Sequence, residues 1–121
     1  MKLKSSWKQQ LNIVQHISPD RIIGTSFQGY VFASINELTS LFGEPTRKNV
    51  DSLKTYLEWD LECDGIIFTI YDYNIWDTEN EIDPNERVDF HIGGNSSYVA
   101  EFVQHLVKYN INWYENNYRH N

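Results

Sequence analysis

The sequence predicts an α+β fold with a mostly antiparallel sheet, and three observations support this class. Apolar residues recur at helical spacing in three segments, one near the start, one in the middle and one near the end of the chain. The segments between them are rich in β-branched and aromatic residues, which favour strands. Asp64-Gly65 separates two of these strands and is a strong hairpin signal. This order of helices and hairpin-linked strands indicates an α+β domain.

The first half of the chain predicts a helix, a strand and a second, shorter helix. Residues 5–17 carry apolar side chains at helical spacing, so residues 1–18 are expected to form a helical arm. The stretch RIIGTSFQGYVFAS at 21–34 reads as a strand whose two internal glycines indicate a bulge or bend. Ser34 and Glu37 form an S-x-x-E capping box at the start of the next helix, which Gly43 ends.

The second half predicts a hairpin, a further strand and a helix. Residues 51–62, DSLKTYLEWDLE, alternate apolar and polar side chains and are expected to form a strand buried on one side. The returning strand is IIFTIYDYNIW at 66–76, and the acidic residues 77–87 form a loop. VDFHI at 88–92 is another strand, and a helix runs from Ser97 to Tyr109. An aromatic tail remains at 110–121.

The composition limits the classes of function. The 121 residues, 40% of them apolar, suit a single domain over residues 1–121. A net charge of −7 argues against broad binding to nucleic acid, and no apolar run reaches the ~20 residues of a membrane span. The start MKLKSSWKQQ lacks the apolar core of a signal peptide, and the single Cys63 excludes an internal disulfide. We therefore expect a cytoplasmic protein that binds neither nucleic acid nor membrane.

The stretch HIGGNSS at 91–97 leads from a strand into a helix and has two interpretations. The first N–H groups of a helix lack internal partners and attract anions, so Gly93, Gly94, Asn95 and Ser96 could hold a phosphate. Alternatively, Asn95 or Ser96 caps the helix and the glycines only make the turn. The Walker lysine and the spaced third glycine of nucleotide-binding loops are missing.

Two aromatic stretches could bind a base. In GTSFQGYV, Phe27 offers a stacking face beside Gln28, although a phenylalanine in a strand is more often core. In YDYNIW, the rings of Tyr71, Tyr73 and Trp76 lie on both sides of the strand end. Asp72 and Asn74 could read a base edge or a ribose hydroxyl. An aromatic interface or core is the alternative for this second stretch.

Arginine is scarce, and the titratable residues indicate no enzyme. Arg47 and Arg87 could meet a phosphate, but Arg87 could equally form a surface ion pair with Glu86 or Asp89. His91 shares a strand face with Asp89, which is more often a structural pair than a catalytic base. No nucleophile motif or zinc spacing occurs, and the acidic loop lacks the glycine and glutamate of a calcium-binding loop. We expect no metal and no cofactor.

Five motifs in order, TSFQGYV, FGEP, D-x-x-K-x-x-x-EW, IYDY and HIGG, resemble a group of small phage proteins. The first family of Thoeris anti-defence proteins is identified as a member of this group. The resemblance covers roughly residues 24 to 103 and rests on the ordered combination, since no single motif is specific. It implies a sponge that binds glyco-cyclic ADP-ribose in the host cytoplasm without cleaving it. It also implies a homo-oligomer, in which the aromatic tail would suit a subunit contact.

The chemistry of these motifs selects the candidate ligand-binding residues. They are Phe27, Gln28, Arg47, Tyr71, Asp72, Asn74, Trp76, Arg87, His91, Gly93, Gly94, Asn95 and Ser96.

An alternative function belongs to another class. An acidic phage protein could inhibit a host defence enzyme by direct binding or by mimicking DNA, which the charge of −7 favours weakly. Against it, the carboxylates form no long stripe of one sign. A protein whose aromatic surface serves assembly alone is a third possibility.

Overall fold

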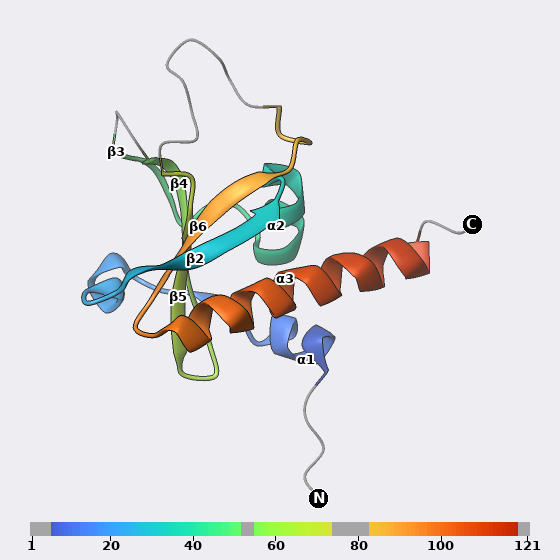
Figure 1. Ribbon diagram of the computed structural model, residues 1–121, viewed down its shortest axis with the longest axis horizontal. Coiled ribbons are helices and arrows are strands. Elements are labelled where there is room, and N and C mark those ends of the chain that lie inside the picture. Colours follow the sequence, from blue (N-terminus) through green and yellow to red (C-terminus); the bar gives the residue numbers. More distant parts are fainter. Residues whose placement is uncertain (1–5, 52–54, 74–82, 119–121) are drawn as a thin grey trace, which may run out of the picture.

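A computed structural model describes residues 6–51, 55–73 and 83–118 and shows the predicted α+β domain (Figure 1). In chain order its elements are α1 (Trp7–Asn12), β1 (Gln15–His16), the 3₁₀ helix η1 (Pro19–Ile22), β2 (Ser26–Ala33), α2 (Ile35–Phe42), β3 (Arg47–Asp51), β4 (Thr55–Cys63), β5 (Ile66–Tyr71), β6 (Val88–Gly94) and α3 (Ser97–Tyr118).

The strands form one antiparallel six-stranded sheet in the order β1-β4-β5-β6-β2, and β3 also pairs with β4. The predicted hairpin is confirmed, because Asp64 and Gly65 have φ values of 49° and 84° between β4 and β5. Two successive left-handed residues give the turn a twist that matches the strands. The predicted bulge in β2 is also confirmed, between Phe27 and Gly29.

The three α-helices lie to one side of the sheet in Figure 1, and α3 runs across it with α1 alongside. The core lies between the sheet and these helices. Trp59, Phe68 and Phe90 of the sheet are fully buried there, as is Leu106 of α3. The capping box of α2 is confirmed, since the Ser34 hydroxyl accepts from the Glu37 N–H at 3.0 Å. We call the opposite side of the sheet the open face.

The expectation that β4 is buried on one side only was wrong. Trp59 and Leu61 face the core as predicted, but the exposed fractions of Glu58 and Asp60 on the open face are 8% and 0%. The predicted alternation of apolar and polar residues along β4 is correct, but the prediction that the polar side is exposed to solvent is wrong. Arg47 of β3 lies against both carboxyl groups and pairs with them. A polar pattern therefore did not imply a solvated face here.

The N-terminal arm is shorter than expected. Helix α1 ends at Asn12. Gln15 and His16, which were expected to continue the helix, form β1 and pair with the edge of β4 instead. The Ile17 N–H donates to the Asp60 carbonyl at 3.0 Å, and η1 then replaces the start of the expected strand 21–34. An open strand edge offers backbone hydrogen bonds that a short isolated helix cannot match.

Two other boundaries also differ from the prediction. Strand β5 ends at Tyr71, and the residues 77–82 of the expected loop lie outside the described part. Helix α3 does not stop at Tyr109 but continues to Tyr118, so most of the expected tail is helical. Asn110 is 3% exposed, and its side-chain amide donates to the Trp7 carbonyl at 2.9 Å, which anchors the extension. Among the described helices, none is both long and apolar enough to span a membrane.

Candidate functional site

A row of side chains crosses five strands on the open face. Each member is the cross-strand partner of the next, so neighbouring side chains lie within contact distance. From β3 to β2 the row is Arg47, Glu58, Tyr71, His91 and Tyr30. These residues come from five separate strands, and the sheet register brings them together.

The bulge in β2 adds a sixth side chain to this surface. Tyr30 pairs with His91 and Phe27 pairs with Gly93, so both aromatic rings lie on the open face although they are three positions apart. In a regular strand such residues would point to opposite faces. The extra residue is Gln28, whose side-chain amide donates to the Gly94 carbonyl at 3.0 Å and the Ser26 hydroxyl at 3.2 Å. Gln28 thus stabilises the bulge.

Four aromatic rings surround the His91 imidazole, and we call this group the aromatic cluster. The ring centroids of Phe27, Tyr30, Tyr71 and Tyr73 lie 5.2, 5.0, 5.3 and 5.5 Å from that of His91. The exposed fractions of Phe27, Tyr30 and Tyr73 are 47%, 50% and 38%. Large half-exposed rings gathered at one place are a stacking surface for a planar ligand.

Burial shapes the charge state of this cluster. Desolvation lowers the pKa of His91, so the imidazole is neutral at pH 7, and it raises the pKa of the Tyr71 phenol. The His91 Nδ1 is buried and has no hydrogen-bond partner among the described residues. The cluster is therefore an uncharged aromatic surface with one unused polar atom.

The other end of the row is a buried ionic group. Arg47 donates to Glu58 and, through its Nε at 2.9 Å, to Asp60. Burial raises the pKa of Glu58 to about 8, with Asp60 adding to the rise and Arg47 opposing it. Glu58 is thus protonated near neutral pH and Asp60 carries the charge that pairs with Arg47. Asp60 Oδ1 is otherwise without a partner among the described residues, and the Glu58 proton satisfies it.

The two glycines of HIGGNSS lie inside β6 and serve close packing. A Cβ atom on Gly93 would lie 2.3 Å from the Thr69 hydroxyl, and one on Gly94 would lie 2.7 Å from the Val99 side chain. Both glycines are therefore explained without a ligand, by close packing within β6 rather than by the turn that the alternative interpretation expected. Asn95 and Ser96 are exposed and lead into α3, whose start lies next to the Phe27 end of the aromatic cluster.

Five of the candidate residues meet on the open face, and the others are placed differently. Phe27, Arg47, Tyr71, His91 and Gly93 share this face. Asp72 is buried and accepts from the Leu57 N–H at 3.0 Å, which indicates a structural role. Asn74 and Trp76 lie outside the described residues. His91 contacts aromatic rings rather than forming the expected pair with Asp89.

Four members of the site were not among the candidate residues. They are Tyr30, Tyr73, Glu58 and Asp60, although the sequence drew attention to the ring of Tyr73 and placed Glu58 and Asp60 on one polar strand face. No pattern within the sequence indicates that Tyr73, beyond the end of β5, turns back to His91.

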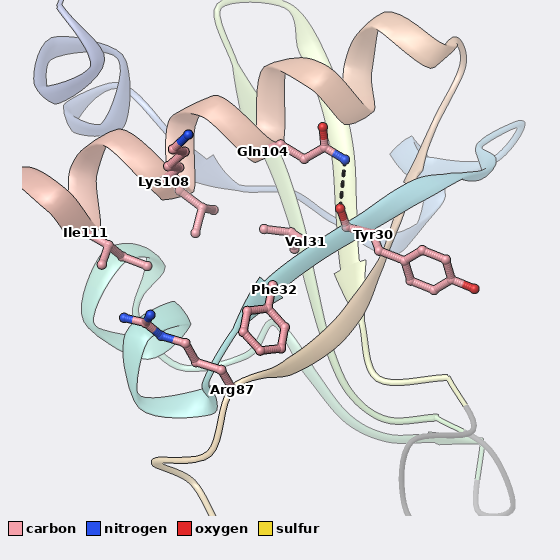
Figure 2. Close-up of a pocket in the computed structure, with 8 residues that line it drawn as sticks. Tyr30, Val31, Phe32, Arg87, Gln104, Lys108 and Ile111 are labelled. Carbon is pink, nitrogen blue, oxygen red and sulfur yellow. Dashed lines mark hydrogen bonds between the residues drawn. The ribbon is translucent and has the colours of Figure 1, made fainter.

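Arg87 lines a separate pocket on the far side of β2 (Figure 2). The pocket measures about 250 Å³ and lies between β2 and α3. Arg87 pairs with Glu37 of α2, at 2.6 Å from its Nη2, rather than with Glu86 or Asp89. Arg87 is thus not part of the open face.

Comparisons with known proteins add no relative. No protein-family model matches the chain, and neither the curated proteins nor the solved structures contain a match. The functional argument therefore rests on the site itself.

Proposed function

We propose that this protein binds and sequesters a cyclic ADP-ribose-type nucleotide, such as glyco-cyclic ADP-ribose, on its open face and does not cleave it. In this role it is a phage protein of the host cytoplasm that blocks Thoeris signalling. The aromatic cluster around His91 is the observation that carries the proposal. The ordered motifs described above support it, because TSFQGYV, IYDY and HIGG supply Phe27, Tyr71 and His91.

Stacking of the base explains why these rings are half exposed. A base stacked on an aromatic side chain contributes about 1–3 kcal/mol. Phe27 and Tyr30 lie edge to face at 5.0 Å between centroids, which leaves their outer surfaces available. In the proposed complex the phenolic groups of Tyr30 and Tyr71 bond ribose hydroxyls at the rim. Tight capture needs several such contacts together.

The charges on the face tolerate the pyrophosphate. Arg47 and Asp60 balance each other, and Glu58 is neutral near pH 7, so the row carries no net charge there. The first turn of α3 has N–H groups that a phosphate can approach, and its residues Ser97 and Tyr98 are exposed. In this arrangement the base lies on Phe27 and the phosphates lie toward α3.

The state of the reactive side chains favours capture over cleavage. Cys63 is fully buried, its thiol contacts the Gln10 carbonyl at 3.4 Å, and burial raises its pKa. His91 is held among hydrophobic rings, with a lowered pKa. A thiolate nucleophile and a charged general acid are both disfavoured in these environments.

DNA mimicry receives less support. A mimic needs exposed carboxylates in the spacing of phosphates. In the described part of the chain, several acidic side chains are already engaged in ion pairs with arginine. Glu37, Asp60 and Glu62 pair with Arg87, Arg47 and Arg21.

Isothermal titration with glyco-cyclic ADP-ribose tests the proposal. We expect tight binding that Phe27→Ala weakens by about tenfold or more, because one stacked ring is lost. Phe32→Ala is the matched control, since Phe32 is an exposed phenylalanine of the same strand that pairs with Asp89 rather than Gly93. Heating the complex should release intact ligand. Absence of binding would refute capture, and release of a cleaved product would show an enzyme.

A further inference from the structure

Strand β2 ends the sheet, and its free edge faces the pocket beneath α3. β2 pairs with β6 on one side, and α3 packs across it on the other side. Figure 2 shows the resulting hollow, with α3 above, the β2 backbone at its side and Arg87 at one end. An edge strand with room beside it is a site where another strand can add to a sheet.

The backbone of β2 already accepts an amide from outside the sheet. The Gln104 side-chain amide donates to the Tyr30 carbonyl at 2.8 Å, across the pocket (Figure 2). This bond shows that the Tyr30 carbonyl points away from β6. Because the direction alternates along an antiparallel strand, the backbone of Phe32 points the same way. Gln104 thus occupies a position that a peptide N–H group would take in an added strand.

The pocket walls suit one apolar side chain. Val31 and Val107 form its buried base, and Ile111 of α3 borders it. Phe32 is 62% exposed at its rim. A volume of about 250 Å³ is smaller than the roughly 300–1,000 Å³ of sites for drug-sized ligands. This size fits a single residue of a peptide better than a whole nucleotide.

The charge at the pocket is opposite to that of the chain. Lys108 is exposed and lies 5.8 Å from the Tyr109 ring centroid, and among the described residues it forms no ion pair. Arg87 lies at the other end, oriented by Glu37. In a protein of net charge −7, this local cation favours an acidic partner. It disfavours a second copy of the chain, which would add another −7.

We propose that β2 and α3 form a docking groove for an extended acidic peptide segment of another protein. The peptide adds a strand to β2, places one apolar side chain in the pocket and a carboxylate near Lys108. Main-chain hydrogen bonds supply affinity and the pocket supplies selectivity. This groove is distinct from the aromatic cluster, because Phe32 alternates onto the open face but makes no ring contact with His91, and Tyr30 contributes its carbonyl here and its ring there.

Fluorescence anisotropy with two labelled peptides tests the groove. One peptide alternates valine with glutamate, and the other alternates valine with lysine. We expect the glutamate peptide to bind and Lys108→Glu to weaken it by about tenfold through charge reversal. Lys48→Glu is the matched control, because Lys48 is an exposed lysine of β3, which pairs with β4 at the end of the sheet away from β2. Alternate amides of an extended peptide point to opposite edges of the strand. N-methylation of the amides that face β2 should abolish binding, and N-methylation of those that point away from β2 should have no effect.

The groove and the open face respond to different variants. Phe32→Ala should weaken the glutamate peptide and leave nucleotide binding intact, whereas Phe27→Ala should do the reverse. Equal binding of the lysine peptide, equal loss in Lys48→Glu, or no effect of N-methylation on either edge would overturn the proposal. A dimer of the free protein that Phe32→Ala dissociates would instead assign the groove to a second copy.

Discussion

Glu58 is a carboxyl group that burial keeps protonated close to neutral pH. Its pKa rises to about 8 from an ordinary value of 4.5, because the group is desolvated and lies beside Asp60. Below pH 4.5 both the folded and the unfolded chain hold this proton. Between pH 4.5 and about 8 the unfolded chain releases it and the folded chain keeps it. The contribution of Glu58 to the free energy of unfolding therefore falls as the pH rises through this window, and it falls no further above the window.

Replacing Glu58 by glutamine should remove this pH dependence. The amide mimics the protonated acid, donating to Asp60 Oδ1 and accepting from Arg47. We expect Glu58→Gln to be more stable than the native protein at pH 8.5, by several degrees in Tm, and similar to it near pH 5. Urea and thermal unfolding across this range measure the difference. His91, with its lowered pKa, destabilises the fold on acidification, so the comparison must be between the two proteins at each pH.

Glu44→Gln is the control for this experiment. Glu44 precedes β3 and is exposed, and its Oε2 lies 3.6 Å from Nζ of Lys48 in β3. Its replacement should therefore leave the pH profile of stability unchanged. A native protein whose stability does not fall between pH 5 and pH 8 relative to Glu58→Gln would contradict the protonated state of Glu58.

At the scale of elements, the pairing of β5 with β6 requires Gly93. A methyl group there would meet the Thr69 hydroxyl at 2.3 Å, within the sheet. We expect Gly93→Ala to destabilise the protein by about 1–3 kcal/mol through overpacking. In a Thr69→Ala background the nearest atom of residue 69 becomes its Cβ, 3.7 Å away, and the same substitution should cost far less. Equal losses in both backgrounds, measured by denaturant unfolding, would show that the hydroxyl is not the obstacle.

Elements with local signals were predicted, and elements stabilised by distant partners were not. The Asp64-Gly65 turn and the Ser34–Glu37 capping box each depend on residues within three positions, so the sequence reveals them. Strand β1 depends on the edge of β4, about 45 positions away, and no local pattern distinguishes it from a continuing helix. The same reason explains why Tyr30 and Glu58 were missing from the predicted site.

At the scale of the whole molecule, the N-terminal helix α1 packs against the C-terminal helix α3. The Trp7 ring stacks on Tyr109 with centroids 5.9 Å apart and packs against Phe102 at 5.8 Å. Asn110 bonds to the Trp7 carbonyl from α3. Helix α1 has six residues, too few to be stable alone, so its order depends on this contact.

Trp7→Ala should therefore loosen the N-terminal segment without unfolding the sheet. We expect amide exchange over residues 7–16 to accelerate by about tenfold or more, while β4 and β5 keep their protection. Tyr98→Ala provides the comparison, because Tyr98 is an exposed aromatic residue of the same helix and is not among the described rings that contact Trp7. Exchange that accelerates equally in the sheet would mean that α1 is part of the cooperative core.

The sequence by itself determined the fold class, the hairpin, the bulge and the start of α2, because propensity, turn chemistry and caps act between near neighbours. It also indicated that Phe27, Tyr71 and His91 carry chemistry suited to a ligand. Only the tertiary structure decided that they meet, since a cross-strand register joins residues from separate strands and a single bulge sets the face of Phe27. It likewise decided that Arg47 pairs with the buried Asp60 carboxylate and that β2 is an edge strand of the described sheet, because burial and sheet order are properties of the assembled chain.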